Sequence, residues 1–170
     1  MNLVHCTTAH LGTIRAIFND AIATSTALYD LEPRSEAVVS EWFESKRQGG
    51  WPVIGLVGAD GGLLGFGTYG PFRPHAAYRS TVEHSVYVQA GQRGRGAGRQ
   101  LLTHLIHLAR QHGFHMLIGG IDAENAASIG LHQSLGFTHC GRIRHAGFKF
   151  GRWLDLEFYQ LILEAPEPRE

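Results

Sequence analysis

A glycine- and arginine-rich turn in the middle of this 170-residue chain constrains its fold more than any other feature. The turn runs from Gly91 to Gly98, follows the alternating pattern of a strand and leads directly into an amphipathic helix. Glycine lets successive backbone N–H groups point into one concavity, and the helix N-terminus behind them adds partial positive charge. The segment therefore predicts a site for a phosphate or pyrophosphate, with a plain glycine-rich turn as the alternative.

The position of this turn excludes two common nucleotide folds. A dinucleotide-binding turn follows the first strand and has an acidic residue about 20 residues later, whereas this turn follows several expected strands. The Gly-x-x-x-x-Gly-Lys-Ser/Thr loop of nucleoside triphosphate-binding proteins is absent from the sequence.

Hydrophobic periodicity predicts a mixed α+β domain, because antiparallel-type strands precede a single β-α-β crossover. We expect one domain over residues 1–164 and a frayed tail over 165–170. Helices are expected over 10–23, 35–46, 98–113 and 125–135. In the second of these, Ser35 is the expected cap, and Val38, Val39, Trp42 and Phe43 are expected to face inward. Strands are expected from Leu3 and over 52–57, 64–72, 81–88, 114–121, 138–144 and 153–163.

Composition narrows the class of protein. Hydrophobic residues make up 44% of the chain, which is enough for a substantial core. Lys+Arg and Asp+Glu are both 15, so the basic excess typical of nucleic-acid binders is missing. We find no apolar stretch of membrane-spanning length and no signal-peptide pattern, and Cys6 and Cys140 form no disulfide framework. A cytoplasmic protein is expected.

Two motifs resemble those of the GCN5-related N-acetyltransferases (GNAT). Arg93–Gly98 is similar to the family's Gln/Arg-x-x-Gly-x-Gly/Ala signature, and Asn125–Phe137 resembles its second motif. The resemblance implies a twisted, mostly antiparallel central sheet flanked by helices, with strands splayed at the acetyl-CoA site. The residues implied in holding acetyl-CoA are Val86, Tyr87, Val88, Arg93, Gly94, Arg95, Gly96, Ala97, Gly98, Arg99, Asn125 and Ser128.

Three further segments narrow the resemblance to the phosphinothricin N-acetyltransferase group, which includes enzymes that acetylate methionine sulfoximine and methionine sulfone. These segments are Thr81–Val88, Leu131–His132 and Ala146–Asp155. The resemblance implies resistance to herbicides or antimetabolites, a homodimer, and acetylation of a small amino-acid-like amine by direct attack. It also implies that the region of Lys149, Trp153 and Asp155 lies close to the active site and the dimer partner, with a structural Lys–Asp pair that braces a turn as the alternative.

Acetyl transfer to an amine needs a base for the ammonium proton and an acid for the leaving thiolate. Glu83 is the candidate base, because it precedes the glycine-rich turn on the expected strand and burial would raise its pKa. By resemblance, His132 is the candidate acid. A structural Glu–Arg pair and a buried helix histidine are the respective alternatives.

Arginines near the candidate base suit a small anionic substrate, because a guanidinium binds a carboxylate or phosphinate through paired hydrogen bonds. We expect Arg73 and Arg79 to hold the substrate carboxylate, Phe72 to wall the pocket and Tyr29 to line it. Solvated loop arginines are the alternative. The herbicide-resistance enzymes carry Lys and Asp near these two arginines, so the resemblance favours the methionine sulfoximine branch.

Other functions receive less support from the sequence. No Cys/His spacing resembles a zinc site, although His104 and His107 share a helix face. A Gly-x-Ser-x-Gly nucleophile motif is absent. Two alternatives remain open, which are acetylation of peptide or protein amines and a non-catalytic acetyl-CoA-binding protein of the same fold.

Overall fold

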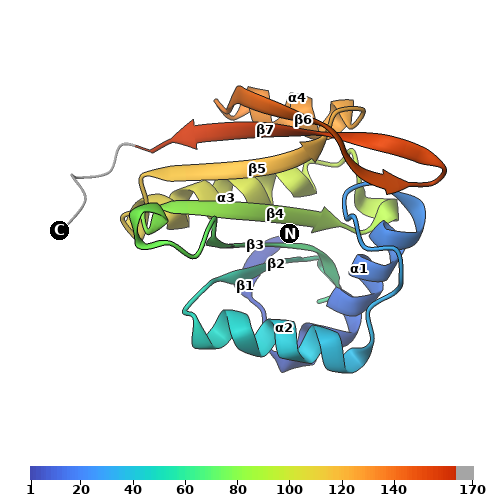
Figure 1. The fold of residues 1–170 in the computed structure, drawn as a ribbon. Coiled ribbons are helices and arrows are strands. Elements are labelled where there is room, and N and C mark those ends of the chain that lie inside the picture. The colour runs from blue at the N-terminus through green and yellow to red at the C-terminus, as the bar shows by residue number, and fades with distance from the viewer. Residues whose placement is uncertain (164–170) are drawn as a thin grey trace. The chain divides into compact units, whose positions relative to one another are not determined.

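The computed structural model describes residues 1–163 and shows a mixed α+β fold (Figure 1). Hydrogen bonds join its seven strands in the order β1-β2-β3-β4-β5-β7-β6. The strands are β1 (Asn2–His5), β2 (Val53–Val57), β3 (Leu63–Pro71), β4 (Thr81–Val88), β5 (Met116–Asp122), β6 (Thr138–Lys149) and β7 (Arg152–Ile162); the α-helices are α1 (Leu11–Thr24), α2 (Glu36–Gln48), α3 (Ala97–Gln111) and α4 (Ala126–Ser134).

The chain divides into two compact units. The first unit contains residues 1–69 and 85–102, and the second contains residues 70–84 and 103–163 of the described chain. Strand β4 belongs to both units, because the division falls after His84.

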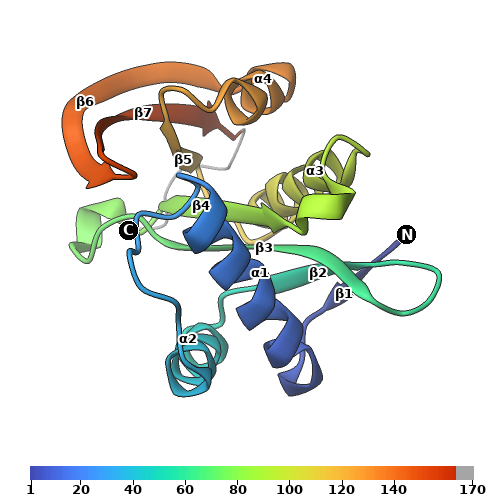
Figure 2. The same ribbon diagram turned by 90° about the vertical axis from the view of Figure 1, so that its right-hand side faces the viewer.

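In the first unit, α1 and α2 pack on one face of the strands (Figure 2). Their shared core includes Ile14 and Phe18 of α1, Val39 and Phe43 of α2, and Phe66 of β3. Strands β1, β2 and β3 pair in antiparallel order. Helix α2 begins as expected at Ser35, whose side chain accepts a hydrogen bond from the Val38 backbone N–H at 3.3 Å.

In the second unit, β4 runs parallel to β5, and β5 pairs antiparallel with β7, which pairs with β6. The β6–β7 hairpin turns at Phe150 and Gly151, which both have positive φ, at 51° and 74°. Two such residues in sequence match a type I′ turn, whose twist suits paired strands. Figure 2 shows this long, curved hairpin beside α4.

The expected fold class and mostly antiparallel sheet are confirmed, and β4 has the predicted bounds. One helix-face prediction is wrong, because Val38 is 47% exposed. A helix turns about 100° per residue, so Val38 lies off the stripe formed by Val39 and Phe43. The final hairpin is also longer than expected. Strand β6 continues to Lys149. The sequence does not predict this length, because bulges near Gly141 and Gly147 interrupt the side-chain alternation that marks a strand.

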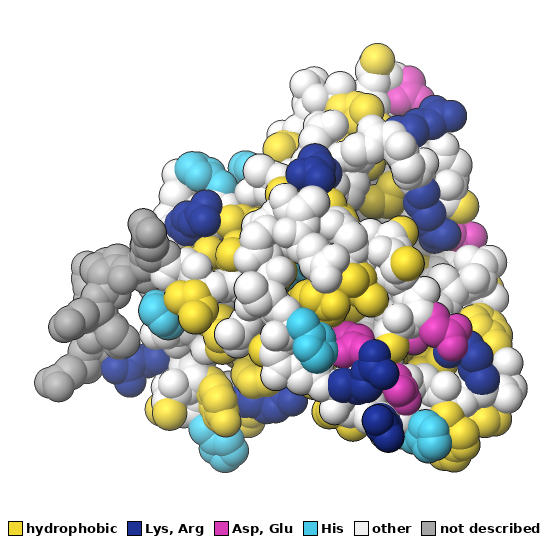
Figure 3. Space-filling view, turned by 90° about the horizontal axis from the view of Figure 1, so that it is seen from above, with side chains coloured by type: hydrophobic (Ala, Val, Ile, Leu, Met, Phe, Trp, Pro, Cys, Tyr) yellow, Lys and Arg dark blue, Asp and Glu magenta, His cyan; other side chains and the backbone are white. Residues whose placement is uncertain are grey.

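Three further expectations concern the C-terminal tail, membrane-spanning segments and the surface charge. The expected tail at 165–170 lies outside the described residues. Within residues 1–163, no helix has the length and hydropathy needed to cross a membrane. The face in Figure 3 shows basic and acidic side chains interspersed, in keeping with the formal net charge of zero.

Candidate functional site

The glycine-rich turn after β4 has the backbone geometry expected for an anion site. Gly94 and Gly96 adopt positive φ angles of 73° and 83°, which residues with side chains rarely adopt. The Gln100 backbone N–H donates to the Gly96 carbonyl at 3.0 Å, so the turn runs straight into the first turn of α3. The turn's backbone therefore fits a phosphate-bearing ligand at the helix N-terminus.

Basic side chains surround this turn in the first unit. Arg93 donates to the Val88 carbonyl and pairs with Asp20 at 3.3 Å. Arg95 is exposed in the turn, and Arg99 is exposed in the first turn of α3. The turn and the start of α3 therefore carry positive charge, and the ion pair with Asp20 orients Arg93.

Strand β4 presents two different faces. Val82 and His84 are buried, at 0% and 6% exposed, whereas Glu83, Ser85 and Tyr87 alternate with them and are half-buried. Alternation places these three polar side chains on one face of the strand. The candidate base therefore lies on a half-buried strand face.

The pairing between β4 and β5 ends early. It covers Thr81, Val82 and Glu83, which face Met116, Leu117 and Ile118, although both strands continue beyond that point. Val86, Tyr87 and Val88 are half-buried and lie beyond the paired stretch. This early end matches the expected splay.

A buried histidine pair lies in the second unit. His84 of β4 and His132 of α4 face each other with 2.9 Å between their Nε2 atoms, and both side chains are 6% exposed. His132 Nδ1 lies 2.7 Å from the Ser128 carbonyl oxygen. A carbonyl only accepts, so Nδ1 of His132 carries the proton and its Nε2 accepts from His84.

Burial keeps both histidines neutral. Burial lowers the pKa of His84 far below the usual value, and the neighbouring His132 lowers it further. Burial also lowers the pKa of His132, against a smaller opposing effect from its hydrogen bond to Ser128. The Phe137 ring packs against both imidazoles, with centroid distances of 5.3 Å to His84 and 5.0 Å to His132.

The histidine pair depends on a glycine in β5. A Cβ atom at Gly119 would lie 2.7 Å from Cε1 of His84 and 3.2 Å from Nε2 of His132. The adjacent Gly120 faces the opposite way, and a Cβ there would lie 3.6 Å from the Glu83 carboxylate. The two glycines thus leave room for the histidine pair on one side of β5 and for Glu83 on the other.

Asn125 caps α4. Its side chain accepts a hydrogen bond from the Ser128 backbone N–H at 3.1 Å. Ser128 is half-buried, and its carbonyl is the partner of His132 described above.

The predicted substrate-binding residues lie in several places. In the second unit, the Arg73 guanidinium stacks over the Phe72 ring at 4.1 Å, and Arg79 is exposed on the same loop. Tyr29 is half-buried in the first unit. Lys149 is only 4% exposed, and its ammonium group lies over the Phe150 ring. Asp155 accepts a hydrogen bond from the His145 backbone N–H. Trp153 is exposed, and its ring stacks on His145.

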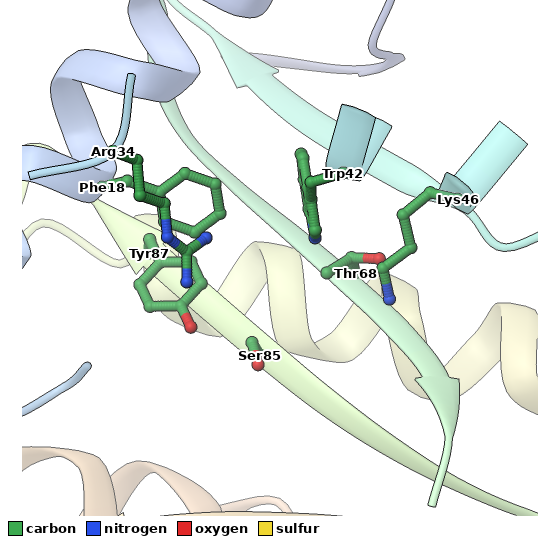
Figure 4. Close-up of a pocket in the computed structure, with 7 residues that line it drawn as sticks. All are labelled: Phe18, Arg34, Trp42, Lys46, Thr68, Ser85 and Tyr87. Carbon is green, nitrogen blue, oxygen red and sulfur yellow. The ribbon is translucent and has the colours of Figure 1, made fainter. Parts of the chain in front are cut away.

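The structure also shows a pocket that sequence analysis missed. It has a volume of about 190 Å³ and lies within the first unit. Figure 4 shows Arg34 beside the rings of Phe18 and Tyr87, and Lys46 beside Thr68. Residues Phe18, Arg34, Trp42, Lys46, Thr68, Ser85 and Tyr87 line it, and we call it the Arg34–Lys46 pocket. Its two cations come from separate parts of the sequence, so no local motif marks it.

Comparison with known proteins identifies the family. The model of the acetyltransferase (GNAT) family matches residues 14–137, which is most of the chain. This chain is a member of the GNAT acetyltransferase family. The L-methionine sulfoximine/L-methionine sulfone acetyltransferase of Pseudomonas aeruginosa is 47% identical over 156 residues, covering 92% of this chain and 91% of that protein.

The chain is also similar to two phosphinothricin acetyltransferases. The phosphinothricin N-acetyltransferase of Alcaligenes faecalis is 36% identical and covers 91% of this chain and 79% of that protein. The crystal structure of a phosphinothricin acetyltransferase from Sinorhizobium meliloti, solved with acetyl-CoA, has a TM-score of 0.95 and 34% identity over 99% of this chain and 93% of that one.

Family membership makes this chain an N-acetyltransferase that uses acetyl-CoA. The turn from Gly91 to Gly98 has the backbone and charge that such a cosubstrate needs. Within residues 1–163, no group of three or more His, Cys, Asp or Glu side chains is placed to hold a metal ion.

Proposed function

We propose that the chain transfers the acetyl group of acetyl-CoA to the primary amine of a small amino-acid-like substrate, of the methionine sulfoximine, methionine sulfone or phosphinothricin type. One observation carries this proposal: strand β4 bears the half-buried Glu83 and leads directly into the glycine-rich turn. The names of the relatives support the substrate class.

The proposed acetyl-CoA site uses the turn and its neighbours. The backbone of Gly94 and Gly96 and the N-terminus of α3 would hold the pyrophosphate, with Arg93, Arg95 and Arg99 adding charge. In the first unit, the strand residues Val86, Tyr87 and Val88 are proposed to contact the rest of the cosubstrate, and Ala97 and Gly98 are the first two residues of α3. Asn125 and Ser128 of the second unit are proposed as further cosubstrate contacts.

Glu83 would accept the proton that the substrate ammonium loses, so that the amine can attack. When bound, acetyl-CoA supplies an activated acetyl group as a thioester. Burial raises the pKa of the Cys6 thiol to about 11 and raises that of Cys140, so neither forms a thiolate readily. Direct attack by the amine, without a covalent enzyme intermediate, is therefore the favoured route.

The role of His132 as general acid stays a prediction. In the structure, both of its ring nitrogens have partners, which are the Ser128 carbonyl and His84. The hydrogen bond to His84 therefore has to break before Nε2 can exchange a proton with a ligand. The contacts by themselves support a positioning role in α4.

Arg73 and Arg79 are proposed to hold the substrate carboxylate, with Phe72, Tyr29 and Lys149 around the substrate. The stacking of Arg73 on Phe72 supports this, because it presents the guanidinium in a fixed orientation.

We further propose a homodimer in the cytoplasm. The β6–β7 hairpin of the second unit exposes large hydrophobic side chains, namely Ile143, Phe148, Phe150 and Trp153, each at least 50% exposed. Exposed apolar patches of this kind mark interaction sites. Analytical ultracentrifugation tests the dimer, and a monomer at micromolar concentration would overturn it.

The proposed function is tested by acetyl-CoA-dependent thiol release with a panel of amines. The panel contains methionine sulfoximine, methionine sulfone, phosphinothricin, ordinary amino acids, a polyamine and short peptides. We expect saturable turnover on the first three, weakened in Arg73→Ala and Arg79→Ala. Turnover on peptides or polyamines alone would overturn the substrate class, and acetyl-CoA binding without any turnover would favour a binding protein.

A further inference from the structure

We propose that the Arg34–Lys46 pocket holds the side chain of the amino-acid substrate and selects side chains that end in hydrogen-bond-accepting oxygen atoms, such as a sulfone, sulfoximine or phosphinate. This proposal rests on the proposed function and adds to it the residues that set side-chain specificity. The pocket lies within the first unit and involves none of the arginines proposed for the substrate carboxylate.

The walls of the pocket are aromatic. The Phe18 ring packs edge-on against Trp42 and Tyr87, with a centroid distance of 5.1 Å to each. Phe66 lies behind them, 5.0 Å from Phe18 and 5.4 Å from Tyr87. Rings packed in this way form a fixed apolar surface, which suits the methylene groups of a short side chain.

Two cations are fixed at the pocket. The Arg34 guanidinium lies 4.1 Å above the Phe18 ring and pairs with Asp30 at 3.0 Å. The backbone of Arg34 is held by Asn19, whose side chain both accepts from its N–H and donates to its carbonyl. The pairing with Asp30 uses one of the five N–H donors of the guanidinium.

Lys46 is anchored at the side of the pocket where Thr68 lies. Its ammonium group donates to the Tyr69 carbonyl at 3.1 Å, while its side chain reaches from α2 toward Thr68 (Figure 4). The hydroxyl of Ser85 lies between the two cations in the same view. The lining therefore combines aromatic walls with charged and hydroxyl donors, and it contains no Asp or Glu.

The charge and the size of the pocket define its ligand. Asp30 pairs with one edge of the Arg34 guanidinium, and Lys46 adds a second positive charge, so the lining attracts oxygen acceptors and disfavours the ammonium of a lysine or polyamine. The volume of about 190 Å³ is below the roughly 300–1,000 Å³ of sites for drug-sized ligands. A short, oxygen-terminated side chain matches both properties better than a peptide does.

The strand that carries the candidate base also lines the pocket. Ser85 and Tyr87 follow Glu83 at two-residue intervals on the same face of β4. Two residues of a strand span about 7 Å, which is the reach of an amino-acid side chain from its α-amine. Ser85 and Tyr87 are thus the residues of this strand face that line the pocket in the first unit.

The test compares two amino acids that differ only at the third position of the side chain, which is an SO2 group in methionine sulfone and a CH2 group in norleucine. Methionine sulfone carries two acceptor oxygens, and norleucine of similar length carries none. We expect Arg34→Met and Lys46→Met, which keep the aliphatic stem, each to lower kcat/KM for methionine sulfone about 10-fold, mostly through KM. For norleucine, kcat/KM should change less than about 2-fold. Arg47→Met, an exposed neighbour outside the pocket, is the matched control and should leave both values unchanged.

The outcomes separate this proposal from the proposed function. If the wild-type protein acetylates no amino acid, the proposed function fails. If the wild type acetylates methionine sulfone and both variants match it, the pocket proposal alone fails. Equal losses on methionine sulfone and norleucine would also overturn it, because the pocket would then not distinguish oxygen acceptors. Thermal unfolding of each variant checks that the fold is intact.

Discussion

The Arg34–Lys46 pocket and the His84–His132 pair place ionisable side chains in opposite surroundings. The pocket is open, and aromatic rings and hydroxyl groups surround its two fixed cations. The histidine pair is buried and kept neutral, with each ring facing the other and Phe137 packed against both. The first arrangement is suited to binding a ligand, whereas the second is suited to fixing α4 against β4.

Strand β4 contributes residues to both arrangements. His84 lies on its buried face, and Glu83, Ser85 and Tyr87 lie on the half-buried face. The type of an ionisable residue therefore says little about its role. Burial and partners decide whether it carries charge for a ligand or hydrogen-bonds within the fold.

The largest effect is expected on the half-buried face of β4. Glu83→Gln removes the proposed base while keeping the shape of the side chain, so kcat should fall about 100- to 10,000-fold. Thiol release measures this, and calorimetry should show unchanged acetyl-CoA binding. The matched control is Glu36→Gln on the exposed start of α2. Wild-type turnover in Glu83→Gln would show that another group accepts the proton.

The second effect concerns the buried pair. Gly119→Ala places a Cβ atom 2.7 Å from His84, so the imidazoles or β5 have to shift. We expect a loss of about 1–3 kcal/mol in the free energy of unfolding, measured in urea. Gly12→Ala in α1 is the control, because its Cβ meets nothing within 4 Å and alanine favours a helix. An unchanged stability of Gly119→Ala would contradict the tight packing of the pair.

The third effect is a pH dependence. Both histidines have folded-state pKa values below the ordinary value, so the unfolded chain binds more protons in acid. Their contribution to stability is present above about pH 6.5 and is lost as the pH falls toward the folded values. Between pH 7.5 and 5.5, we expect a loss of about 1 kcal/mol from His84, whose folded pKa is about 3, and a further loss in the same direction from His132.

Urea unfolding at the two pH values measures this loss, and His84→Gln should reduce it because one titrating group is gone. His75→Gln, in an exposed loop, is the control. The pH assignment would be wrong if His84→Gln and the wild type lost the same stability.

The smallest effect separates two roles of one residue. Asn125→Ala removes the cap of α4 and should cost about 1 kcal/mol, whereas Asn125→Asp keeps an oxygen acceptor and should cost less. Chemical unfolding measures both. If Asn125 also contacts acetyl-CoA, Asn125→Asp weakens cosubstrate binding despite its intact cap; unchanged binding would restrict Asn125 to capping.

Local features of the sequence predicted much of the fold. The alternation over Thr81–Val88, the cap at Ser35 and the stop at Gly113 each depend on neighbouring residues, and each is confirmed. The end of β6 was missed, because bulges and the positive φ of His145 hide the strand period.

The pocket and the histidine pair could not be predicted in the same way. Arg34, Lys46 and Ser85 come from the loop before α2, from α2 and from β4, and only the packing of the first unit brings them together. His84 and His132 lie 48 residues apart in the sequence. The one local signal was Gly119-Gly120, a pair of glycines inside an otherwise apolar strand, which often marks a close approach.

The most direct test of the account is to identify the product formed from acetyl-CoA and methionine sulfone by mass spectrometry and NMR. We expect acetylation on the α-amine, with one free thiol released for each acetyl group transferred. The opposite result is that acetyl-CoA binds but no N-acetylated product forms from methionine sulfone, methionine sulfoximine or phosphinothricin. That result would contradict acetyl transfer to a small amino-acid-like amine.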